Sequence, residues 1–373
     1  MIPVFRPSYT EKEIRAVGKT LKSGWVGLGP KTREFEEKFA AYIGVNYAVA
    51  VNSATSALHL AYHVAGIAGK EVITTPMTFV STNHAILHNH GIPVFADIEP
   101  DTLNIDSRKI GPLVSLKTRA ICVVHYGGYA CDMGPVMRLA KRYGLLVIED
   151  CAHACGGEYG NKKLGSIGHL GCFSFHAVKN LATGDGGMIT TNSREYYERL
   201  LKLRWMGIDK NTWDRTDTDC HRYSWYYNVT DLGYKMHMND IAATLGLVQL
   251  ERLEAMNARR AEITTQYTKA FSGLSDFVLP SRKAYMTKPA YHNYVIKYPG
   301  RDKLINWLAQ NGISTGVHYI PSNHYEIYRT YRGKTPVCDE IWKYILTLPL
   351  FPDLRSKEVK QIIARVRSHV LKK

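Results

Sequence analysis

Apolar residues recur along this chain in two alternating patterns. Short β-prone runs cover residues 47–51, 72–75, 93–96, 120–124 and 145–148, and stretches with helical spacing lie between most of them. Strands that alternate with helices predict a mainly parallel sheet with helices on both faces. Ligands of such sheets bind at the carboxyl ends of the strands, so the residues that follow these runs are the first candidates for a site.

Helical patterns also flank this region on both sides. Before it, a capping box at Thr10 opens one helix and Gly44 ends a second. After it, a helix over 239–254 is expected to run into a second helical pattern that ends near Phe271. The remaining patterns predict a strand over 291–298, a helix over 301–311, a strand over 313–319 and a helix over 356–370. We therefore predict a large domain over residues 1–255 and a smaller C-terminal α/β domain over 256–373, which begins with a connecting helix.

Composition narrows the class of protein. The chain has 373 residues, 45% of them hydrophobic, and a net charge of +15. Lys and Arg are spread along the chain, without a basic block interleaved with aromatic residues, which favours an anionic small molecule over nucleic acid. A generally basic surface is the alternative explanation of the charge. Residues 45–69 contain no Lys, Arg, Asp or Glu, but polar residues interrupt the stretch, so we expect a buried strand, turn and helix and no membrane span.

The cysteines indicate the compartment. There are seven, an odd number with no paired spacing, and several lie on or beside the predicted strands. Free cysteines in such places behave as small apolar residues, so we expect a reducing cytoplasm. The N-terminus shows no signal-peptide pattern. Cys151, Cys155 and His153 lack a second ligand cluster, so no metal site is predicted.

One lysine stands out by its surroundings. Lys179 follows an apolar run and precedes a glycine-rich turn with Gly184, Gly186 and Gly187. Burial disfavours the ammonium form and lowers a lysine's pKa, and a neutral amine attacks a carbonyl to form a Schiff base. A surface lysine whose stem covers apolar side chains would show the same local pattern.

A pair of carboxylates ends an earlier apolar run, residues 145–148. Glu149 and Asp150 close an apolar strand, and His153 follows. A carboxylate at the end of a buried strand is placed to pair with a cationic ring nitrogen, as pyridoxal phosphate requires for its ring to act as an electron sink. A helix N-cap or a solvated turn is the alternative role for Asp150.

A third segment is suited to a phosphate group. Ser53, Ala54 and Thr55 follow the first predicted strand and open an apolar helical run. Free backbone N–H groups and hydroxyls at a helix N-terminus bind anions. Ordinary helix capping by Ser53 or Thr55 would leave the same pattern.

Together these motifs resemble the DegT/StrS family of sugar aminotransferases. The resemblance rests on residues 174–180 (Ser-Phe-His-Ala-Val-Lys-Asn), 183–187 (Thr-Gly-Asp-Gly-Gly), 149–154 (Glu-Asp-Cys-Ala-His-Ala) and 52–59 (Asn-Ser-Ala-Thr-Ser-Ala-Leu-His). It extends from residues 23–26 to 348–352. It implies pyridoxal phosphate (PLP) as cofactor, the aspartate-aminotransferase fold (fold type I), with a mainly parallel seven-stranded-type sheet, and a homodimer with active sites at the interface.

The resemblance also implies roles for individual residues. Lys179 is the catalytic residue and holds the cofactor. The other cofactor-binding residues carried over are Asp150, His153 near the phenolic oxygen, Ser174, Ala54 and Thr55 near the phosphate, Phe79 stacked on the ring, and Asn228 from the partner subunit. Phe79 is also a candidate for an ordinary core phenylalanine. The substrate-binding candidates are Trp25, Lys235, His318, Tyr319 and His324. Residues 232–238 (Leu-Gly-Tyr-Lys-Met-His-Met) depart from the commonest family pattern, which puts the roles of Asn228 and Lys235 in doubt.

The expected reaction is transfer of an amino group from an amino acid, L-glutamate by resemblance, to a nucleotide-linked 3- or 4-keto-deoxysugar. It would serve the biosynthesis of amino sugars in polysaccharides or glycans. An aminocyclitol precursor or another non-nucleotide ketone is the alternative acceptor. Lys179 disfavours the related dehydratases, which replace this lysine with histidine. A non-catalytic basic binding or regulatory protein and a nicotinamide reductase are disfavoured by the complete motif set and by the absence of a Gly-x-Gly-x-x-Gly segment after the first strand.

Overall fold

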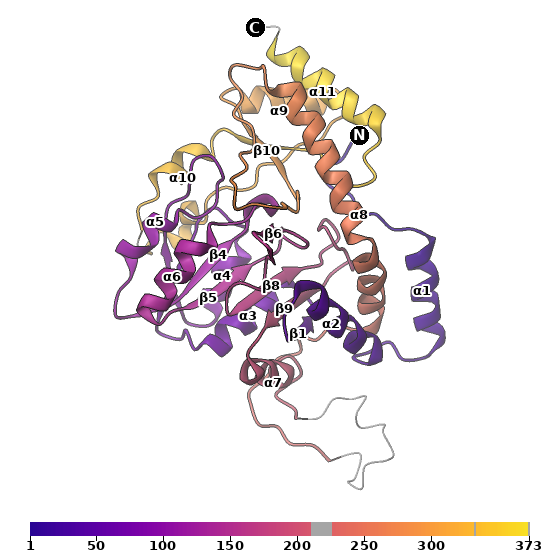
Figure 1. Ribbon diagram of the computed structural model, residues 1–373, viewed down its shortest axis with the longest axis vertical. Helices are drawn as coiled ribbons and strands as arrows, with labels where there is room; N and C mark the ends of the chain where they lie inside the picture. Colours follow the sequence, from indigo (N-terminus) through magenta and orange to yellow (C-terminus); the bar gives the residue numbers. More distant parts are fainter. Residues whose placement is uncertain (210–225, 332, 372–373) are drawn as a thin grey trace.

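The computed structural model describes residues 1–209, 226–331 and 333–371. A large sheet with helices around it forms one part of the molecule, and a long helix, α8, leads from it to a smaller part that contains α9, α11 and β10 (Figure 1). The α/β class expected from the alternating patterns is confirmed.

The helices are α1 (Glu11–Lys22), α2 (Pro30–Ile43), α3 (Ala54–Ala65), α4 (Ser81–His88), α5 (Ser107–Ile110), α6 (Met133–Tyr143), α7 (Arg194–Leu203), α8 (Asp240–Phe271), α9 (Arg301–Gln310), α10 (Pro336–Ile341) and α11 (Ser356–Val370). The strands are β1 (Tyr47–Val51), β2 (Glu71–Thr74), β3 (Ile92–Phe95), β4 (Thr118–Val124), β5 (Leu146–Asp150), β6 (Glu158–Tyr159), β7 (Lys162–Lys163), β8 (Leu170–Ser174), β9 (Gly187–Thr191), β10 (Tyr294–Lys297) and β11 (Ile345–Leu348).

The large sheet is mixed and mainly parallel. Its seven strands have the order β1-β9-β8-β5-β4-β2-β3, and β9 runs antiparallel to both of its neighbours. The parallel pairing of β5 with β8 places Asp150 opposite Cys172. The carboxyl ends of these two central strands therefore lie side by side, and the chain that leaves β8 starts from the same edge as Asp150.

The sheet is anchored by buried apolar side chains on its two faces. On one face Val49, Cys122 and Ile148 pack with Leu58 of α3. On the other face Phe173 and Phe175 pack with Phe35 and Phe39 of α2. Each such large apolar side chain contributes about 1.5–3 kcal/mol by leaving water. This packing fixes the positions of the strand ends that carry the candidate site.

The long helix α8 differs from the sequence prediction. Residues 239–271 were expected to form two consecutive helical segments, but α8 is one helix of 32 residues. Its first half packs on the large sheet through residues such as Leu253, and its second half packs on the C-terminal apolar cluster through Ile263, Tyr267 and Phe271. The predicted domain boundary at 255/256 falls inside this helix, and the division into two domains stays a prediction.

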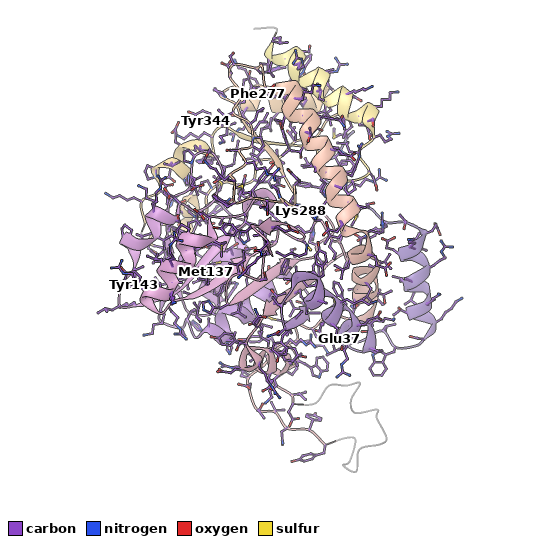
Figure 2. The ribbon with its side chains drawn as sticks, in the orientation of Figure 1. Glu37, Met137, Tyr143, Phe277, Lys288 and Tyr344 are labelled. Carbon is purple, nitrogen blue, oxygen red and sulfur yellow. The ribbon has the colours of Figure 1, made fainter. Side chains whose placement is uncertain are left out.

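The C-terminal part contains a pair of strands, of which the sequence pattern predicted only one. The strand expected over 291–298 is β10, and its antiparallel partner is β11, which was not predicted. The strand expected over 313–319 is wrong, because that segment makes only isolated bridges, such as Gly316 with Thr347. Lys288, labelled in Figure 2, forms an ion pair of 2.5 Å with Glu254 and so joins the segment before β10 to α8.

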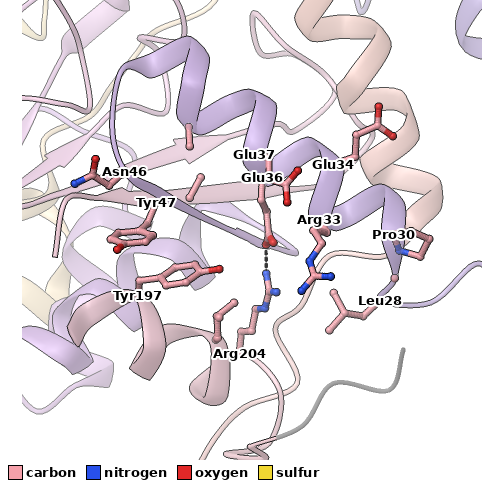
Figure 3. Close-up of a pocket in the computed structure, with 14 residues that line it drawn as sticks. Leu28, Pro30, Arg33, Glu34, Glu36, Glu37, Asn46, Tyr47, Tyr197 and Arg204 are labelled. Carbon is pink, nitrogen blue, oxygen red and sulfur yellow. Dashed lines mark hydrogen bonds and ion pairs between the residues drawn. The ribbon is translucent and has the colours of Figure 1, made fainter. Parts of the chain in front are cut away.

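A buried ion pair fixes α2 and the end of α7 to the edge strand β1. Arg204 and Glu36 are in direct contact, and both also bind the backbone of Ala50, whose N–H donates to Glu36 at 2.7 Å and whose carbonyl accepts from Arg204 at 2.9 Å. The Arg204 side chain is 3% exposed. Figure 3 shows the pair beside Tyr197 along a cavity of about 280 Å³. This cavity lies apart from the motifs of the candidate site.

Replacing Glu36 with Ala should lower the free energy of unfolding by about 3–5 kcal/mol, because Arg204 would keep a buried charge without its partner. Urea unfolding measures this loss. The matched control is Glu34→Ala on the same helix, where the partners Lys31 and Lys38 are exposed and the cost should stay below about 1 kcal/mol. Equal losses in the two variants would contradict the assignment of the Glu36–Arg204 pair as an anchor.

Candidate active site

A cavity of about 350 Å³ lies at the carboxyl ends of β5 and β8. It brings together residues that are far apart in the sequence, from the N-terminus of α3, the segment before α4, the two strand ends, the chain after β8 and residues 318–319. Of the residues singled out in the sequence, the following line it: Ala54, Thr55, Phe79, Asp150, His153, Ser174, Lys179, His318 and Tyr319.

Lys179 lies in the connection between β8 and β9, where its N–H donates to the carbonyl of His176 at 2.8 Å. The residue as a whole is half-buried, and its amine is buried. Burial lowers the pKa of Lys179 to about 8, and the nearby Asp150 carboxylate opposes this shift. A substantial fraction of the amine is therefore neutral close to physiological pH, as nucleophilic attack and proton transfer require.

Asp150 is 3% exposed at the end of β5. One carboxylate oxygen accepts a hydrogen bond of 2.7 Å from the Thr82 hydroxyl, and the other accepts one of 3.0 Å from the N–H of Ala152. Burial raises the pKa of Asp150, while these two hydrogen bonds and the charge of Lys179 act in the opposite direction. The carboxylate thus faces the cavity with two donors behind it.

The neighbouring carboxylate, Glu149, has a different position. It points to the other face of the strand and accepts hydrogen bonds from the N–H groups of Gly165, Ile167 and Gly168 at 2.6–3.0 Å. His125 lies 3.0 Å from it through Nε2. These two groups and the thiol of Cys151 are close enough to hold a metal ion, but the carboxylate oxygens are already engaged by backbone donors. Glu149 therefore fixes the loop before β8.

The start of α3 offers backbone donors to the cavity. Ser53 caps the helix by accepting from the N–H of Ser56 at 3.0 Å, and this cap leaves the N–H groups of Ala54 and Thr55 unused. Gly187 at the start of β9 lets the two backbones approach closely, because a Cβ there would lie 2.5 Å from the carbonyl of Ser53. The glycine of the turn is thus required by the packing of β9 against the helix start.

His153 occupies a stack of rings beside Lys179. Its Nδ1 accepts from the N–H of Gly127 at 3.3 Å, and its Nε2 lies 3.0 Å from the Tyr319 hydroxyl. Its ring stacks on His292 with centroids 4.4 Å apart. Burial holds the pKa of His153 well below its usual value, so the ring is neutral.

Phe79 is 57% exposed at the mouth of the cavity, with its ring centroid 6.0 Å from that of Tyr319. The alternative of an ordinary core phenylalanine is therefore wrong. A large exposed aromatic ring on a cavity wall is suited to contact with a planar ligand.

Comparison with known protein families tests the resemblance that the sequence motifs indicated. The model of the DegT/DnrJ/EryC1/StrS aminotransferase family matches residues 7–367. The chain belongs to this family. The spore coat polysaccharide biosynthesis protein SpsC of Bacillus subtilis is 42% identical over 381 residues, which cover 99% of this chain and 97% of SpsC.

Solved structures of aminotransferases have the same fold. The aminotransferase TlmJ of Streptoalloteichus hindustanus has a TM-score of 0.93 at 32% identity, with 100% of this chain and 99% of TlmJ covered. The putative sugar aminotransferase Spr1654 of Streptococcus pneumoniae in its pyridoxamine-phosphate form has a TM-score of 0.92 at 32% identity, with 100% of both chains covered. A PLP form of Spr1654 also matches. This protein is a PLP-dependent aminotransferase of that fold.

The cavity of the aminotransferase fits that cofactor in the chemistry of its groups. Its walls offer a buried amine, a carboxylate that accepts hydrogen bonds from two donors, and a helix start with unused N–H groups. The cavity that these groups line has a volume of about 350 Å³. These are the partners that an aldehyde, a ring nitrogen and a phosphate need.

Four of the residues carried over from the resemblance lie elsewhere in the described chain. The Trp25 indole donates to the carbonyl of Leu28 at 3.3 Å and lines a separate cavity between α1 and α8. The amine of Lys235 lies 4.7 Å from the centroid of the Trp205 ring. His324 pairs with Asp339 at 2.8 Å, and the backbone N–H of Asn228 donates to the carboxylate of Asp209 at 3.0 Å. None of these four side chains reaches the cavity of its own chain, so contacts from a partner subunit stay a prediction for Asn228 and Lys235.

Thr82 is a member of the cavity that sequence reasoning missed. It lies 68 residues from Asp150, and the contact follows from the packing of α4 against the end of β5. Thr78 and Phe79 precede α4, and Thr82 follows them by four and three residues in its first turn, so the sequence offers only this spacing as a signal. A threonine in that position is common enough that the spacing alone indicates no role.

The lowered pKa of Lys179 predicts how the aminotransferase without cofactor takes up added PLP. The rate of covalent attachment should rise about tenfold per pH unit below pH 8 and level off above it, because only the neutral amine reacts. Stopped-flow absorbance measures the rate. Lys235→Ala should keep this profile, and a rate that still rises through about pH 10 would show a lysine with its ordinary pKa.

Gly187→Ala tests the close approach of β9 to the start of α3. The added Cβ would lie 2.5 Å from the Ser53 backbone, so the helix start must shift and the affinity for the cofactor should fall by roughly tenfold or more. Equilibrium dialysis of PLP and pyridoxamine phosphate measures it. Gly18→Ala in α1, where nothing lies within 4 Å of the new Cβ, is the matched control and should bind as the parent does.

Proposed function

We propose that this enzyme transfers the amino group of an amino acid, L-glutamate, to a nucleotide-linked 3- or 4-keto-deoxysugar in the biosynthesis of amino sugars for a polysaccharide or glycan. The observation that carries the proposal is the placement of the amine of Lys179 and the carboxylate of Asp150 on the walls of one cavity that the start of α3 also lines. The name of the relative SpsC, a spore coat polysaccharide biosynthesis protein, supports the expected pathway class.

Each wall of the cavity has a part in the proposed mechanism. The N–H groups of Ala54 and Thr55 and the hydroxyl of Ser174 would bind the cofactor's phosphate, and Asp150 would pair with its ring nitrogen. Phe79 would cover one face of the ring, and His153 would contact the phenolic oxygen. When bound, PLP supplies an electron sink that stabilises negative charge on the substrate carbon.

Lys179 has two tasks in this proposal. Its neutral amine would hold the cofactor covalently, and the same group, when free, would accept and return a proton at the substrate carbon. A pKa of about 8 suits both tasks, because a base is most effective when its pKa lies near the working pH. His318 and Tyr319 line the opposite side of the cavity and are proposed to contact the sugar.

The nucleotide-linked acceptor is supported by charge. The chain carries a net charge of +15, and a diphosphate-linked sugar brings negative charge that such a surface attracts. Trp25 and His324 are proposed to contact the substrate outside the cavity of their own chain.

We also propose a homodimer in which Asn228 and Lys235 reach the partner's site. The described segment around them exposes large apolar side chains, namely Tyr226, Tyr227, Val229 and Leu232. Apolar side chains that gather on one exposed segment mark an interaction surface.

A cytoplasmic location is proposed from the cysteines, because the six described ones are free and buried, as suits a reducing compartment. In residues 1–209, 226–331 and 333–371, no helix combines the length and the apolar character needed to cross a bilayer.

Separate substitutions of Lys179 and of Lys235 test the assignment of Lys179 as the lysine that holds the cofactor. Lys179→Ala should lose the visible absorbance of the covalently held cofactor and at least about a thousandfold in transfer rate. Lys235→Ala, the matched control, should keep the absorbance. The opposite result would move the covalent role to Lys235.

The acceptor is tested by loading the enzyme with pyridoxamine phosphate and adding a panel of ketones. Conversion with nucleotide-linked 3- or 4-keto-deoxysugars, followed by mass spectrometry, is expected, and regeneration with L-glutamate should exceed that with other amino acids. Turnover of a keto-cyclitol alone would favour the non-nucleotide acceptor. Salt-sensitive nucleic-acid binding without any transfer would contradict the proposed function.

A further inference from the structure

The carboxylate of Asp150 has an unusual combination of burial and charge. It is 3% exposed, yet a role opposite a protonated ring nitrogen requires it to be an anion. A buried carboxylate stays ionised where hydrogen-bond donors stabilise its charge. The donor that comes from a side chain is the hydroxyl of Thr82, at 2.7 Å.

Thr82, in the first turn of α4, belongs to a chain of two hydroxyls that begins at Thr78, before the helix. Its oxygen lies 2.7 Å from the hydroxyl oxygen of Thr78, and both side chains are buried. A hydroxyl has one proton to donate. Because the proton of Thr82 is committed to the ionised Asp150, the hydroxyl of Thr78 must donate to Thr82, and the whole chain points toward the carboxylate.

We propose that Thr82, with Thr78 behind it, is a positioning residue that keeps Asp150 ionised and turned toward the cavity, so that the proton shared with the cofactor's ring nitrogen stays on the ring. The inference rests on the proposed pairing of Asp150 with that nitrogen. Thr82 acts through Asp150 and takes no part in bond formation at the substrate.

Loss of the Thr82 hydroxyl should move a proton from the cofactor's ring nitrogen to Asp150. Without the hydroxyl the carboxylate is more basic, so the N–H bond of the ring breaks and an O–H bond forms on Asp150. Both groups become neutral, and a neutral ring withdraws electrons less strongly from the substrate carbon. Hydrogen bonds to ionised groups are the strong ones, and a buried site increases their effect.

Other titratable groups surround Asp150 and contribute to its charge state. Those that interact with it are Lys179, His125, Tyr62, Tyr319, Cys122, Cys151 and Cys172, from β4, α3, β8 and the adjoining loops. Burial raises the pKa of the three thiols and of both tyrosines, so they stay neutral. His125 is engaged with Glu149. Changes at Thr82 leave all these neighbours in place.

The test uses the holoenzyme and the variants Thr82→Val, Thr82→Ser and Thr78→Val. Valine keeps the shape of threonine and removes the hydroxyl, whereas serine keeps the hydroxyl. The readouts are the pH at which the visible absorbance of the lysine–cofactor linkage changes, together with kcat and KM for the amino acceptor.

Thr82→Val should raise that pH by about one unit, because a ring that has lost its positive charge no longer opposes protonation of the linkage. It should lower kcat by roughly tenfold to a hundredfold, with KM changed by less than about threefold. Thr82→Ser should restore both values to within about threefold of the parent. Thr78→Val should shift the pH in the same direction but less.

Two further variants separate the possible failures. Thr20→Val removes a hydroxyl from another buried threonine pair, Thr20 with Thr244 at 2.7 Å, in a different cavity, and should leave the absorbance titration unchanged. Asp150→Asn should shift the titration at least as far as Thr82→Val. If Asp150→Asn shifts it and Thr82→Val does not, or if serine shifts it as far as valine, the inference about Thr82 is wrong. If Asp150→Asn has no effect either, the pairing of Asp150 with the ring is wrong.

Discussion

The site depends on two buried groups that must differ in charge, one neutral and one ionised. An amine that attacks or accepts a proton must be neutral, and a carboxylate that faces a ring nitrogen must be charged. Burial pushes both groups toward their neutral forms. At Lys179 this effect prevails, and its pKa falls to about 8 although Asp150 lies nearby. At Asp150 the donors Thr82 and Ala152 oppose it. Burial still raises the pKa of Asp150, so the hydrogen bonds from Thr82 and Ala152 limit this shift, as the charge of Asp150 limits the shift at Lys179.

The fold supplies this arrangement through the edge at which its parallel strands end. β5 delivers Asp150 and β8 delivers Ser174, and their pairing keeps the two ends adjacent. The chain then turns back as β9, which inserts between β8 and β1 in the opposite direction. Because Gly187 lacks a side chain, β9 starts directly against the backbone of Ser53. The glycine-rich turn thus connects the lysine segment with the helix start that we propose as the phosphate site.

Features of the fold and the site could be predicted from the sequence where the residues that determine them lie close together in the chain. The alternation of strands and helices is a local pattern, and it predicted the sheet and the strand end at Asp150 correctly. β11 was missed because Ile345–Leu348 is short and gains its stability from a partner about fifty residues earlier. The unbroken helix α8 was missed because its two halves bury different faces against different cores. The contact of Thr82 with Asp150 joins residues 68 positions apart, and the local spacing around Thr82 indicates no role by itself.

The cofactor and the acceptor are proposed to be bound by different parts of the chain. In the proposed assignment the groups that hold the cofactor come from residues 53–55, 79, 150–153 and 174–187, whereas His318 and Tyr319 approach from a segment beside β11. The hydroxyl of Tyr126 contacts the carbonyl of His318, and the carboxylate of Asp97 accepts hydrogen bonds from the N–H groups of Val337 and Cys338 in α10. Polar contacts therefore join both segments to residues that follow strands of the large sheet. Residues 318–319 therefore form an outer wall, which contacts the inner groups through the hydrogen bond of 3.0 Å between Tyr319 and His153.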